Sequence, residues 1–542
     1  MAKKRQPPVE KTSVQLVVDD VEITVPEGTT LLEAAKEAGT EVPHYCYHPE
    51  LSSPAQCRLC LVEVEGSPKL MPSCTTTVAE GQVVKTDSES AMKMRQGVLE
   101  FYLVNHPLDC PICDQSGECD LQDFVFSEGR KHGRSKAAKR VIGRDDFGGD
   151  ILFYGDRCVM CTRCVRFMEE MEQKPILTVV ERGNRAVIDT FFEQGLEEAE
   201  WAGNVVDICP VGALVSKDFL YKARAWDLEH TPSICPNCSM GCNIEIHTRD
   251  NLVQRFKPRK NKEVNGSWIC DYGRGRYEWL NQGGRIEKPV IKDRQEPGNG
   301  TQEPLEWKDI LRGLAARLKD SGESVDVIAS PVTSNEDVGA VIGLLKALGG
   351  GKILYRCPTS TEEIVLPGKE GLKRTNQLAP NADGLKILGA VNVGDGSGSG
   401  GLEDVSASNS IVLVLGDRLD DQKDNFAENA SLLVYLGSHT SQALSQADYT
   451  LPITTYVEQE GTFVSSGGRV QRFSKGLEGP HAARPAWSIL NELTSIISGS
   501  SDGDSIEEAF QQLSRISEVF TGLDYGDIGP EGVQLDAVSK KD

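Results

Sequence analysis

The chain has 542 residues, more than one hydrophobic core usually organises, so several domains are expected. With 39% hydrophobic and 26% charged residues it has ordinary globular composition, which excludes wholesale disorder, and its net charge of −23 argues against nucleic acid as the main partner. No apolar run is long enough to cross a bilayer, and residues 1–8 lead into no apolar stretch of the kind a secretory signal has, so a cytosolic setting is expected.

The most informative feature of the composition is its cysteine content: there are 16 cysteines, and all but Cys357 lie between Cys46 and Cys270. Disulfides are rare in a reducing compartment, so grouped cysteines indicate metal or redox chemistry. The grouped cysteines form three sets of four and one set of three. With one histidine added to the short set, this is the ligand number of four metal centres. We number these ligand sets from first to fourth along the chain.

The first predicted element is a β-hairpin over residues 14–25, followed by a capping box at Thr30 that opens a short helix ending at Gly39. The first ligand set follows with the spacing C-x10-C-x2-C-x13-C: Cys46, Cys57, Cys60 and Cys74. This spacing is a relative of the plant-ferredoxin pattern and fits a 2Fe-2S cluster best. We therefore expect a β-grasp ferredoxin domain over residues 12–92.

A helix is predicted over residues 89–104, because Met92, Leu99 and Leu103 recur at helical spacing and a proline follows at position 107. The second ligand set comes next: Cys110, Cys113 and Cys119. It is one thiol short, and imidazole is the usual replacement, so His106 is expected as its fourth ligand. The alternative is that His106 caps the helix. We expect a domain over residues 93–132 in which one histidine and three cysteines bind a 4Fe-4S cluster.

Eleven residues, 130–140, form a basic run without aromatic side chains, which argues against stacking on nucleic-acid bases. A solvated loop is expected here. The alternative is a contact with an acidic neighbouring subunit.

The third ligand set has three thiols on one loop and a remote fourth before a proline: Cys158, Cys161, Cys164 and Cys209. This pattern is typical of a 4Fe-4S cubane, whereas structural zinc sites usually pair two short hairpins with two cysteines each. A ferredoxin-like α/β domain is expected over residues 150–230, with residues 209–214 opening its last helix. Arg163 and Arg166 either offset the negative charge of the centres or form surface salt bridges.

The fourth ligand set follows the same ligand logic and predicts another 4Fe-4S cluster, in a domain over residues 231–285: Cys235, Cys238, Cys242 and Cys270.

The second half alternates helix-like stretches (307–318 and 335–348) with buried strand-like runs, which predicts a doubly wound α/β domain over residues 286–520. The predicted strands are 325–329, 411–415 and 432–436. Residues 396–401 match G-x-G-x-x-G, but no amphipathic helix follows them, so a dinucleotide site is rejected.

The motifs around the first three ligand sets resemble the large iron–sulfur subunit of respiratory complex I, the 75 kDa subunit family of NADH:quinone oxidoreductase. The resemblance rests on residues 46–51, 57–64, 105–123, 161–167 and 207–214, and it runs from about residue 14 to 280. Ser116 departs from the glycine usual in the family but touches no ligand position.

The fourth set resembles the cluster at the front of molybdopterin oxidoreductases, and the second half is similar to a shortened remnant of those enzymes. The similarity is carried by residues 447–452, 458–463 and 468–471. The resemblance implies a molybdopterin-oxidoreductase-like domain without pterin.

The resemblance implies an electron relay without its own substrate site, carrying electrons from a separate NADH/flavin subunit through one 2Fe-2S and three 4Fe-4S clusters towards quinone. It implies partners among the peripheral-arm iron–sulfur subunits of a proton-translocating complex, with no membrane span. The implied location is the cytoplasmic side of the bacterial inner membrane.

Two other enzymes share similar modules. A catalytic molybdenum or tungsten formate dehydrogenase would need a metal-ligating thiolate, for which Cys357 is the one candidate. The stretch after Cys270 is short for enclosing a bis-pterin, and a buried free cysteine is a common structural residue. An iron-only hydrogenase would need more catalytic cysteines than Cys357 and is set aside.

Overall fold

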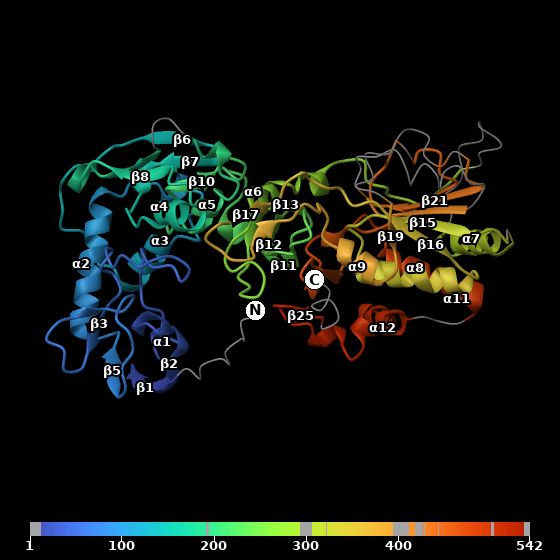
Figure 1. The fold of residues 1–542 in the computed structure, drawn as a ribbon. Helices are drawn as coiled ribbons and strands as arrows, with labels where there is room; N and C mark the ends of the chain where they lie inside the picture. The colour runs from blue at the N-terminus through green and yellow to red at the C-terminus, as the bar shows by residue number, and fades with distance from the viewer. Residues whose placement is uncertain are drawn as a thin grey trace. The chain divides into compact units, whose positions relative to one another are not determined.

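The structure is a computed structural model that describes residues 12–190, 195–292, 306–320, 322–393, 411–417, 427, 429–442, 444–499 and 503–535. The glycine motif at 396–401 lies outside the described residues. The chain divides into two compact units: unit 1 comprises Met1–Asp227 with Pro367–Lys369, and unit 2 comprises Leu228–Leu366 with Glu370–Asp542 (Figure 1).

Unit 1 begins with the predicted hairpin, β1 (Ser13–Val18) and β2 (Val21–Pro26), and this prediction is confirmed. Helix α1 (Leu31–Glu37) follows, with the Thr30 hydroxyl accepting a hydrogen bond from the Glu33 N–H and Gly39 at a φ of 85° just beyond its end. The sheet has the order β2-β1-β5-β3-β4, completed by β3 (Leu61–Val64), β4 (Met71–Pro72) and β5 (Gln82–Lys85). Apolar side chains of α1, β1 and β3 form one buried core with Cys60 and Cys74, which anchors the first ligand set.

Helix α2 (Glu89–Asn105) packs on β3 and on α3 (Asp120–Glu128) (Figure 1). It ends before proline as predicted, but the predicted apolar stripe is only partly correct: Leu99 is buried, whereas Met92 is 43% exposed. The buried position is instead taken by Arg95, whose guanidinium pairs with Glu128 and donates to the Thr86 carbonyl. The basic run 130–140 is a largely exposed loop without helix or strand, as expected.

The rest of unit 1 consists of two small sheets with short helical turns between them. Strands β6 (Arg144–Gly148), β7 (Ile151–Tyr154) and β10 (Leu214–Ser216) form one sheet; β8 (Leu177–Val180) and β9 (Val187–Thr190) form the other. Helices α4 (Arg163–Arg166) and α5 (Asn204–Asp207) lie between strands. The predicted helix opening at 209–214 is wrong: α5 precedes Cys209, and the segment turns directly into β10. Leu214 and Val215 pair with Phe153 and Leu152 of β7, and this pairing takes the place of a helix.

Unit 2 opens with an antiparallel sheet of β11 (Glu229–Ile234), β12 (Asn243–Arg249) and β13 (Leu252–Pro258), followed by α6 (Asp271–Gly275). Two further small sheets consist of β17 (Ile364–Val365) with β18 (Lys373–Arg374), and of β23 (Gly461–Val464), β24 (Arg469–Phe473) and β25 (Val533–Gln534).

The main sheet of unit 2 has seven strands in the order β14-β22-β21-β20-β15-β16-β19, and all neighbours are parallel except β14 with β22. The strands are β14 (Val290–Ile291), β15 (Val325–Ala329), β16 (Gly351–Tyr355), β19 (Val391–Asn392), β20 (Ile411–Leu415), β21 (Leu432–Gly437) and β22 (Tyr449–Pro452). The helices are α7 (Trp307–Asp320), α8 (Asn335–Ala347), α9 (Ala382–Ile387), α11 (Ala486–Ser498) and α12 (Ile506–Ile516).

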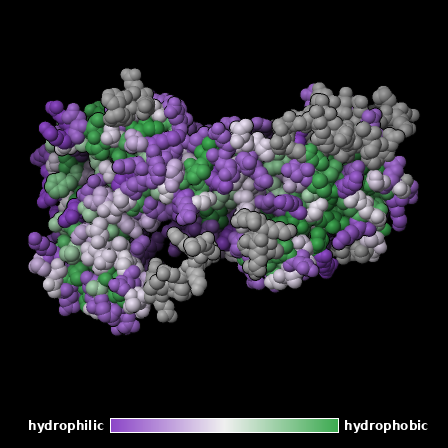
Figure 2. All heavy atoms as spheres, viewed as in Figure 1, coloured by the Kyte–Doolittle hydropathy of each residue, from purple (hydrophilic) through white to green (hydrophobic). Residues whose placement is uncertain are grey.

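Alternate residues of the central strands point to opposite faces of this sheet. In the described part of the chain, the helices α7, α8, α9, α11 and α12 contribute to the core on one face, and a smaller apolar cluster covers the other. The predicted α/β class with parallel strands is confirmed, but the described residues place helices on only one face, so the doubly wound arrangement stays a prediction. Hydrophilic side chains cover much of the visible surface of each unit (Figure 2). Among the described residues no helix is both long and apolar enough to span a bilayer.

Candidate metal centres

All 16 cysteines are free thiols, so the sets are not held together by disulfides. The first ligand set is buried beside the β-grasp core. The Cys74 thiol is hydrogen-bonded with both Cys46 and Cys60. Hydrogen bonding with Cys46, together with burial, raises the pKa of Cys57. These contacts bring all four sulfurs to one place.

The second ligand set lies between α2 and α3: Cys110 opens a short helical turn, Cys113 caps that turn, and Cys119 is the N-cap residue of α3. Burial, with a contribution from the nearby Cys113, raises the pKa of Cys119 to about 12, and Cys113 is in turn within electrostatic reach of Cys110. Cys110 is exposed, whereas the other two are buried. The three thiols therefore form one group with one open side.

His106 occupies the C-terminal cap position of α2, where its backbone N–H donates to the Tyr102 carbonyl at 3.3 Å. Its ring Nδ1 is buried and has no hydrogen-bond partner in the described part of the chain. Burial, and after it the positive charge of Arg157, lower the pKa of His106 to about 4. The ring is therefore neutral at physiological pH, the form that binds metals. A buried ring nitrogen without a partner favours ligation over capping.

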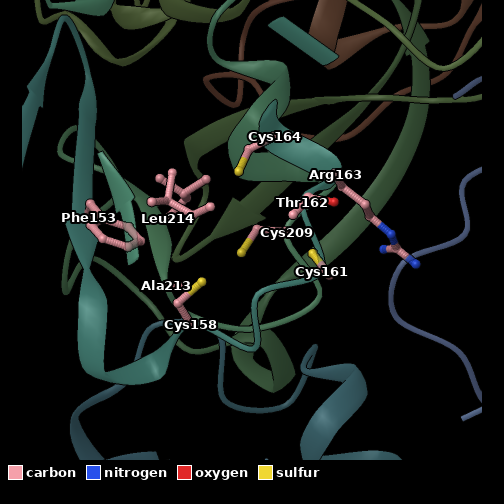
Figure 3. A pocket seen from close by; sticks show the side chains of 10 residues that line it. Phe153, Cys158, Cys161, Thr162, Arg163, Cys164, Cys209, Ala213 and Leu214 are labelled. Carbon is pink, nitrogen blue, oxygen red and sulfur yellow. The ribbon is translucent and has the colours of Figure 1, made fainter. Parts of the chain in front are cut away.

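The third ligand set surrounds a small cavity, and Figure 3 shows its four sulfurs directed towards the same space. Burial raises the pKa of Cys158 to about 12 and that of Cys209 to about 11. The backbone N–H of Met160 donates to the Cys158 sulfur at 3.3 Å, and Met160 itself has a φ of 52°. Such N–H···S bonds stabilise the negative charge that a thiolate-bound cluster carries.

Three arginines next to these loops are largely buried, which argues against surface salt bridges, one of the two alternatives for Arg163 and Arg166. Arg163 donates to the Ile208 carbonyl at 3.2 Å and lies 3.9 Å from the Asp120 carboxylate. Arg157 lies 3.2 Å from the Asp109 carboxylate. Each brings a buried positive charge to a ligand-bearing segment.

The fourth ligand set lies at the start of unit 2 and is buried. The Cys235 N–H donates to the Cys242 carbonyl at 2.8 Å, and the Cys270 sulfur accepts from the Gly273 N–H at 3.3 Å. A Cβ on Gly273 would lie 3.0 Å from the Cys235 sulfur and 3.4 Å from that of Cys270. Burial, with the neighbouring Cys238 next in effect, raises the pKa of both Cys242 and Cys270. The four thiols are therefore close together.

Cys357 lies apart from the four sets, within the apolar core of unit 2. It is 1% exposed, and its thiol donates to the Pro358 carbonyl at 3.5 Å. This environment matches a structural free cysteine and gives no support to the formate dehydrogenase alternative.

The sequence interpretation missed a cluster on β11 and β12: His230, Glu245 and His247 have ligand atoms within 4.8 Å of one another. Arg255 donates to Nδ1 of His247 at 3.1 Å, so the ring proton lies on Nε2, which faces Glu245 at 3.4 Å. This arrangement is a hydrogen-bonded pair, and a metal ion on Nε2 would require loss of the ring proton. The signal in the sequence that could have indicated this cluster is the spacing of two residues between Glu245 and His247, which places both side chains on the same face of a strand.

Five family models match the chain in order. They are the 2Fe-2S iron-sulfur cluster binding domain at residues 11–89, the NADH-ubiquinone oxidoreductase-G iron-sulfur binding region at 95–134, the NADH-quinone oxidoreductase subunit 3 ferredoxin-like domain at 148–215, the molybdopterin oxidoreductase Fe4S4 domain at 228–282 and molybdopterin oxidoreductase at 365–496. The chain thus carries 2Fe-2S and 4Fe-4S binding domains ahead of a molybdopterin-oxidoreductase-type domain.

Curated relatives match over most of the chain. A subunit of the NADH-quinone oxidoreductase of Rickettsia conorii is 31% identical, covering 94% of this chain and 92% of the relative. The mitochondrial NADH-ubiquinone oxidoreductase 78 kDa subunit of Neurospora crassa is also 31% identical, covering 94% and 84%. A solved structure of an NAD+-reducing [NiFe]-hydrogenase in the H2-reduced state is 30% identical over 39% of this chain and 91% of that chain, with a TM-score of 0.36.

Proposed function

Because the chain belongs to the family of the 75 kDa iron–sulfur subunit of NADH-quinone oxidoreductase, we propose that its four ligand sets hold one 2Fe-2S cluster and three 4Fe-4S clusters. The chain is an iron–sulfur electron-transfer subunit of an NADH-quinone oxidoreductase. When bound, such clusters accept and donate single electrons. The protein contributes ligand type, burial, hydrogen bonds to sulfur and nearby charge, which together set their potentials.

The assignment of clusters to sets follows the loops that carry them. The 2Fe-2S cluster would bind the first set: Cys46, Cys57, Cys60 and Cys74. The three 4Fe-4S clusters would bind His106 with the second set, then the third set and then the fourth set. The observation that carries the proposal is that largely buried, unbridged thiols gather in fours on loop-rich segments, as the contacts within the first and fourth sets and the cavity of the third set indicate.

The domain boundaries that accompany this assignment remain those expected from the sequence. We propose a 2Fe-2S domain at 12–92, a domain with one histidine and three cysteine ligands at 93–132, a ferredoxin-like domain at 150–230, a front-cluster domain at 231–285 and an α/β domain without pterin at 286–520. The four ligand sets fall one to each of the first four domains.

We infer that the partners are the NADH/flavin subunit and other peripheral-arm iron–sulfur subunits, on the cytoplasmic side of the bacterial inner membrane. Relatives named as subunits of such complexes support this. The open side of the second set adds support: Cys110 is exposed, and its neighbours Leu108 and Ile112 are 85% and 58% exposed. Apolar side chains beside an exposed ligand fit a surface that another subunit covers.

The test is iron and sulfide quantitation with low-temperature EPR on the wild type and the Cys270→Ala variant. We expect one binuclear and three tetranuclear centres in the wild type, with one tetranuclear signal missing in the variant. Cys357→Ala is the matched control, since this cysteine is also buried but belongs to no set, and it should retain every signal. An unchanged spectrum in Cys270→Ala would contradict the fourth assignment.

A further inference from the structure

The side chain of Arg166 lies between the first and third ligand sets of unit 1. It leaves α4 and is 7% exposed. One of its terminal nitrogens donates to the backbone carbonyls of both Cys46, at 2.5 Å, and Cys161, at 3.3 Å. A single guanidinium therefore joins the backbone of a first-set ligand to that of a third-set ligand.

The second terminal nitrogen of Arg166 donates to the Ser52 carbonyl, on the loop between the first two cysteines of the first set. The Glu170 carboxylate, one turn after Arg166, accepts from the Ser52 N–H at 2.8 Å and from its hydroxyl. The loop after Cys46 is thus held by both side chains. Arginine suits this position, because its planar group presents several donors in a fixed fork and stays charged when buried.

Gln56 forms another connection between the same two loops. Its amide donates to the Met160 carbonyl at 2.9 Å and to the Thr162 hydroxyl at 3.0 Å. Met160 and Thr162 have φ values of 52° and 57°, which are unfavourable for residues other than glycine. The amide therefore stabilises a strained third-set loop while tying it to the first set.

We propose that Arg166 is a positioning residue that fixes the first-set loop against the third-set loop and raises the reduction potentials of the centres in both sets. The inference rests on the proposed function, since it needs clusters at these sets. A reduced cluster is more negative than an oxidised one, so a nearby positive charge favours reduction. Because the side chain is buried, salt screens its charge less than it would at the surface.

Arg163 provides a matched comparison in the same helix. It is 8% exposed, but it donates to the Ile208 carbonyl beside Cys209 and faces the Asp120 carboxylate. Its bonds therefore involve the third set and the segment after the second set, while the bonds of Arg166 involve the first and third sets.

The experiment compares Arg166→Met, Arg166→Lys and Arg163→Met in the full-length chain assembled with its partner subunits. Redox-titrated EPR gives the potential of each centre, and hydrogen exchange reports the order of residues 46–57. In Arg166→Met we expect the equilibrium constant for reduction of both centres to fall about tenfold, which lowers each potential by about 59 mV for one electron. Hydrogen exchange of residues 46–57 should increase in this variant. Arg166→Lys should restore the potentials but not the protection, because an ammonium group lacks the fork. Arg163→Met should lower the third-set potential and leave the first-set potential unchanged.

Unchanged potentials and unchanged exchange in Arg166→Met would overturn the inference. If Arg166→Met loses its iron, Arg166→Lys becomes the deciding variant. Wild-type protection of residues 46–57 in Arg166→Lys would overturn the positioning role, and increased hydrogen exchange there would support it. Absence of a binuclear signal from the wild type is a different result, which would contradict the proposed function itself.

Discussion

Gly212 shows how closely the ligand-bearing segments approach one another at the scale of single residues. A Cβ at this position would lie 2.2 Å from the Cys113 sulfur, which no relaxed structure can accommodate. Because Cys113 is a proposed ligand, its sulfur is not free to rotate away. We expect Gly212→Ala to destabilise unit 1 by about 1–3 kcal/mol and to reduce the iron content of the second-set centre. Chemical denaturation and EPR measure the two effects.

The control for this substitution is Gly97→Ala on α2, where an added Cβ would meet nothing within 4 Å. This change should retain all iron and stabilise the helix by up to about 1 kcal/mol, because alanine has the higher helix propensity. Equal iron content in both variants would show that the contact between Gly212 and Cys113 does not constrain the centre.

The role of His106 is tested by replacing it with cysteine and with alanine. If the ring is a ligand, His106→Cys should keep the iron and lower the potential of that centre by on the order of 100 mV, because a thiolate adds negative charge where imidazole is neutral. His106→Ala should lose iron from the same centre. Redox-titrated EPR checks both. If His106 only caps α2, both variants would retain the centre at its wild-type potential.

At this scale the short spacings predicted which neighbouring thiols lie near one another, because short loops leave little freedom between ligands. The remote members Cys209 and Cys270 were assigned from the ligand pattern and not from loop length. Contacts such as those of Arg166 with Cys46, or of Gly212 with Cys113, could not be predicted. They join segments far apart in the chain, and no local periodicity encodes them. Ligation by the predicted side chains remains a prediction.

At the scale of elements, the most accurate predictions were the buried strands and the amphipathic helices of unit 2. Strand β20 (Ile411–Leu415) and helix α8 (Asn335–Ala347) lie where the sequence placed them, because runs and periodic patterns of apolar residues are local signals. The error at residues 209–214 has a tertiary cause. The segment pairs with β7, and a strand partner is invisible to local pattern.

Helix α8 also carries a buried glutamate that makes the folding stability of unit 2 depend on pH. Glu336 is fully buried and accepts hydrogen bonds from the N–H and hydroxyl of Thr462 on β23, at 2.9 and 2.8 Å. Burial raises its pKa from 4.5 to about 7. The folded state therefore holds the proton more tightly than the unfolded state does. Below pH 4.5 the two states are equally protonated, and stability then declines as pH rises towards 7 by up to about 3 kcal/mol.

Glu336→Gln should remove this dependence, because an amide does not ionise. Its oxygen can still accept from the Thr462 N–H, and its NH2 group can donate to the Thr462 hydroxyl. Denaturant unfolding of wild type and variant between pH 5 and 7.5 measures the difference, which should grow in favour of the variant as pH rises. Glu507→Gln, an exposed position in the first turn of α12, should leave the wild-type slope in place. A constant difference between wild type and Glu336→Gln would refute the assigned titration.

At the scale of the whole molecule, the order of the domains could be predicted, since each has its own cysteine spacing or hydrophobic pattern. That residues 367–369 belong to unit 1 could not be predicted. The Gly368 N–H donates to the Met171 carbonyl at 2.8 Å, and Lys369 pairs with Glu50 at 3.0 Å. These contacts depend on tertiary placement of a short segment that carries no motif.

The ligand-bearing segments and the main sheet of unit 2 should respond differently to loss of iron. The ligand sets lie in loop-rich segments, whereas the strands β15 and β20 contribute to the apolar clusters on the two faces of the main sheet, which contain none of the proposed ligands. Removal of iron by a chelator under reducing conditions should therefore increase hydrogen exchange in the four ligand-bearing segments, 46–74, 106–119, 158–209 and 235–270. Peptides from β15 and β20 should keep their protection, because their stability comes from apolar burial and parallel pairing. Loss of protection in those strands at the same chelator concentration would mean that the clusters stabilise the α/β domain as well, and the independence argued from its core would be wrong.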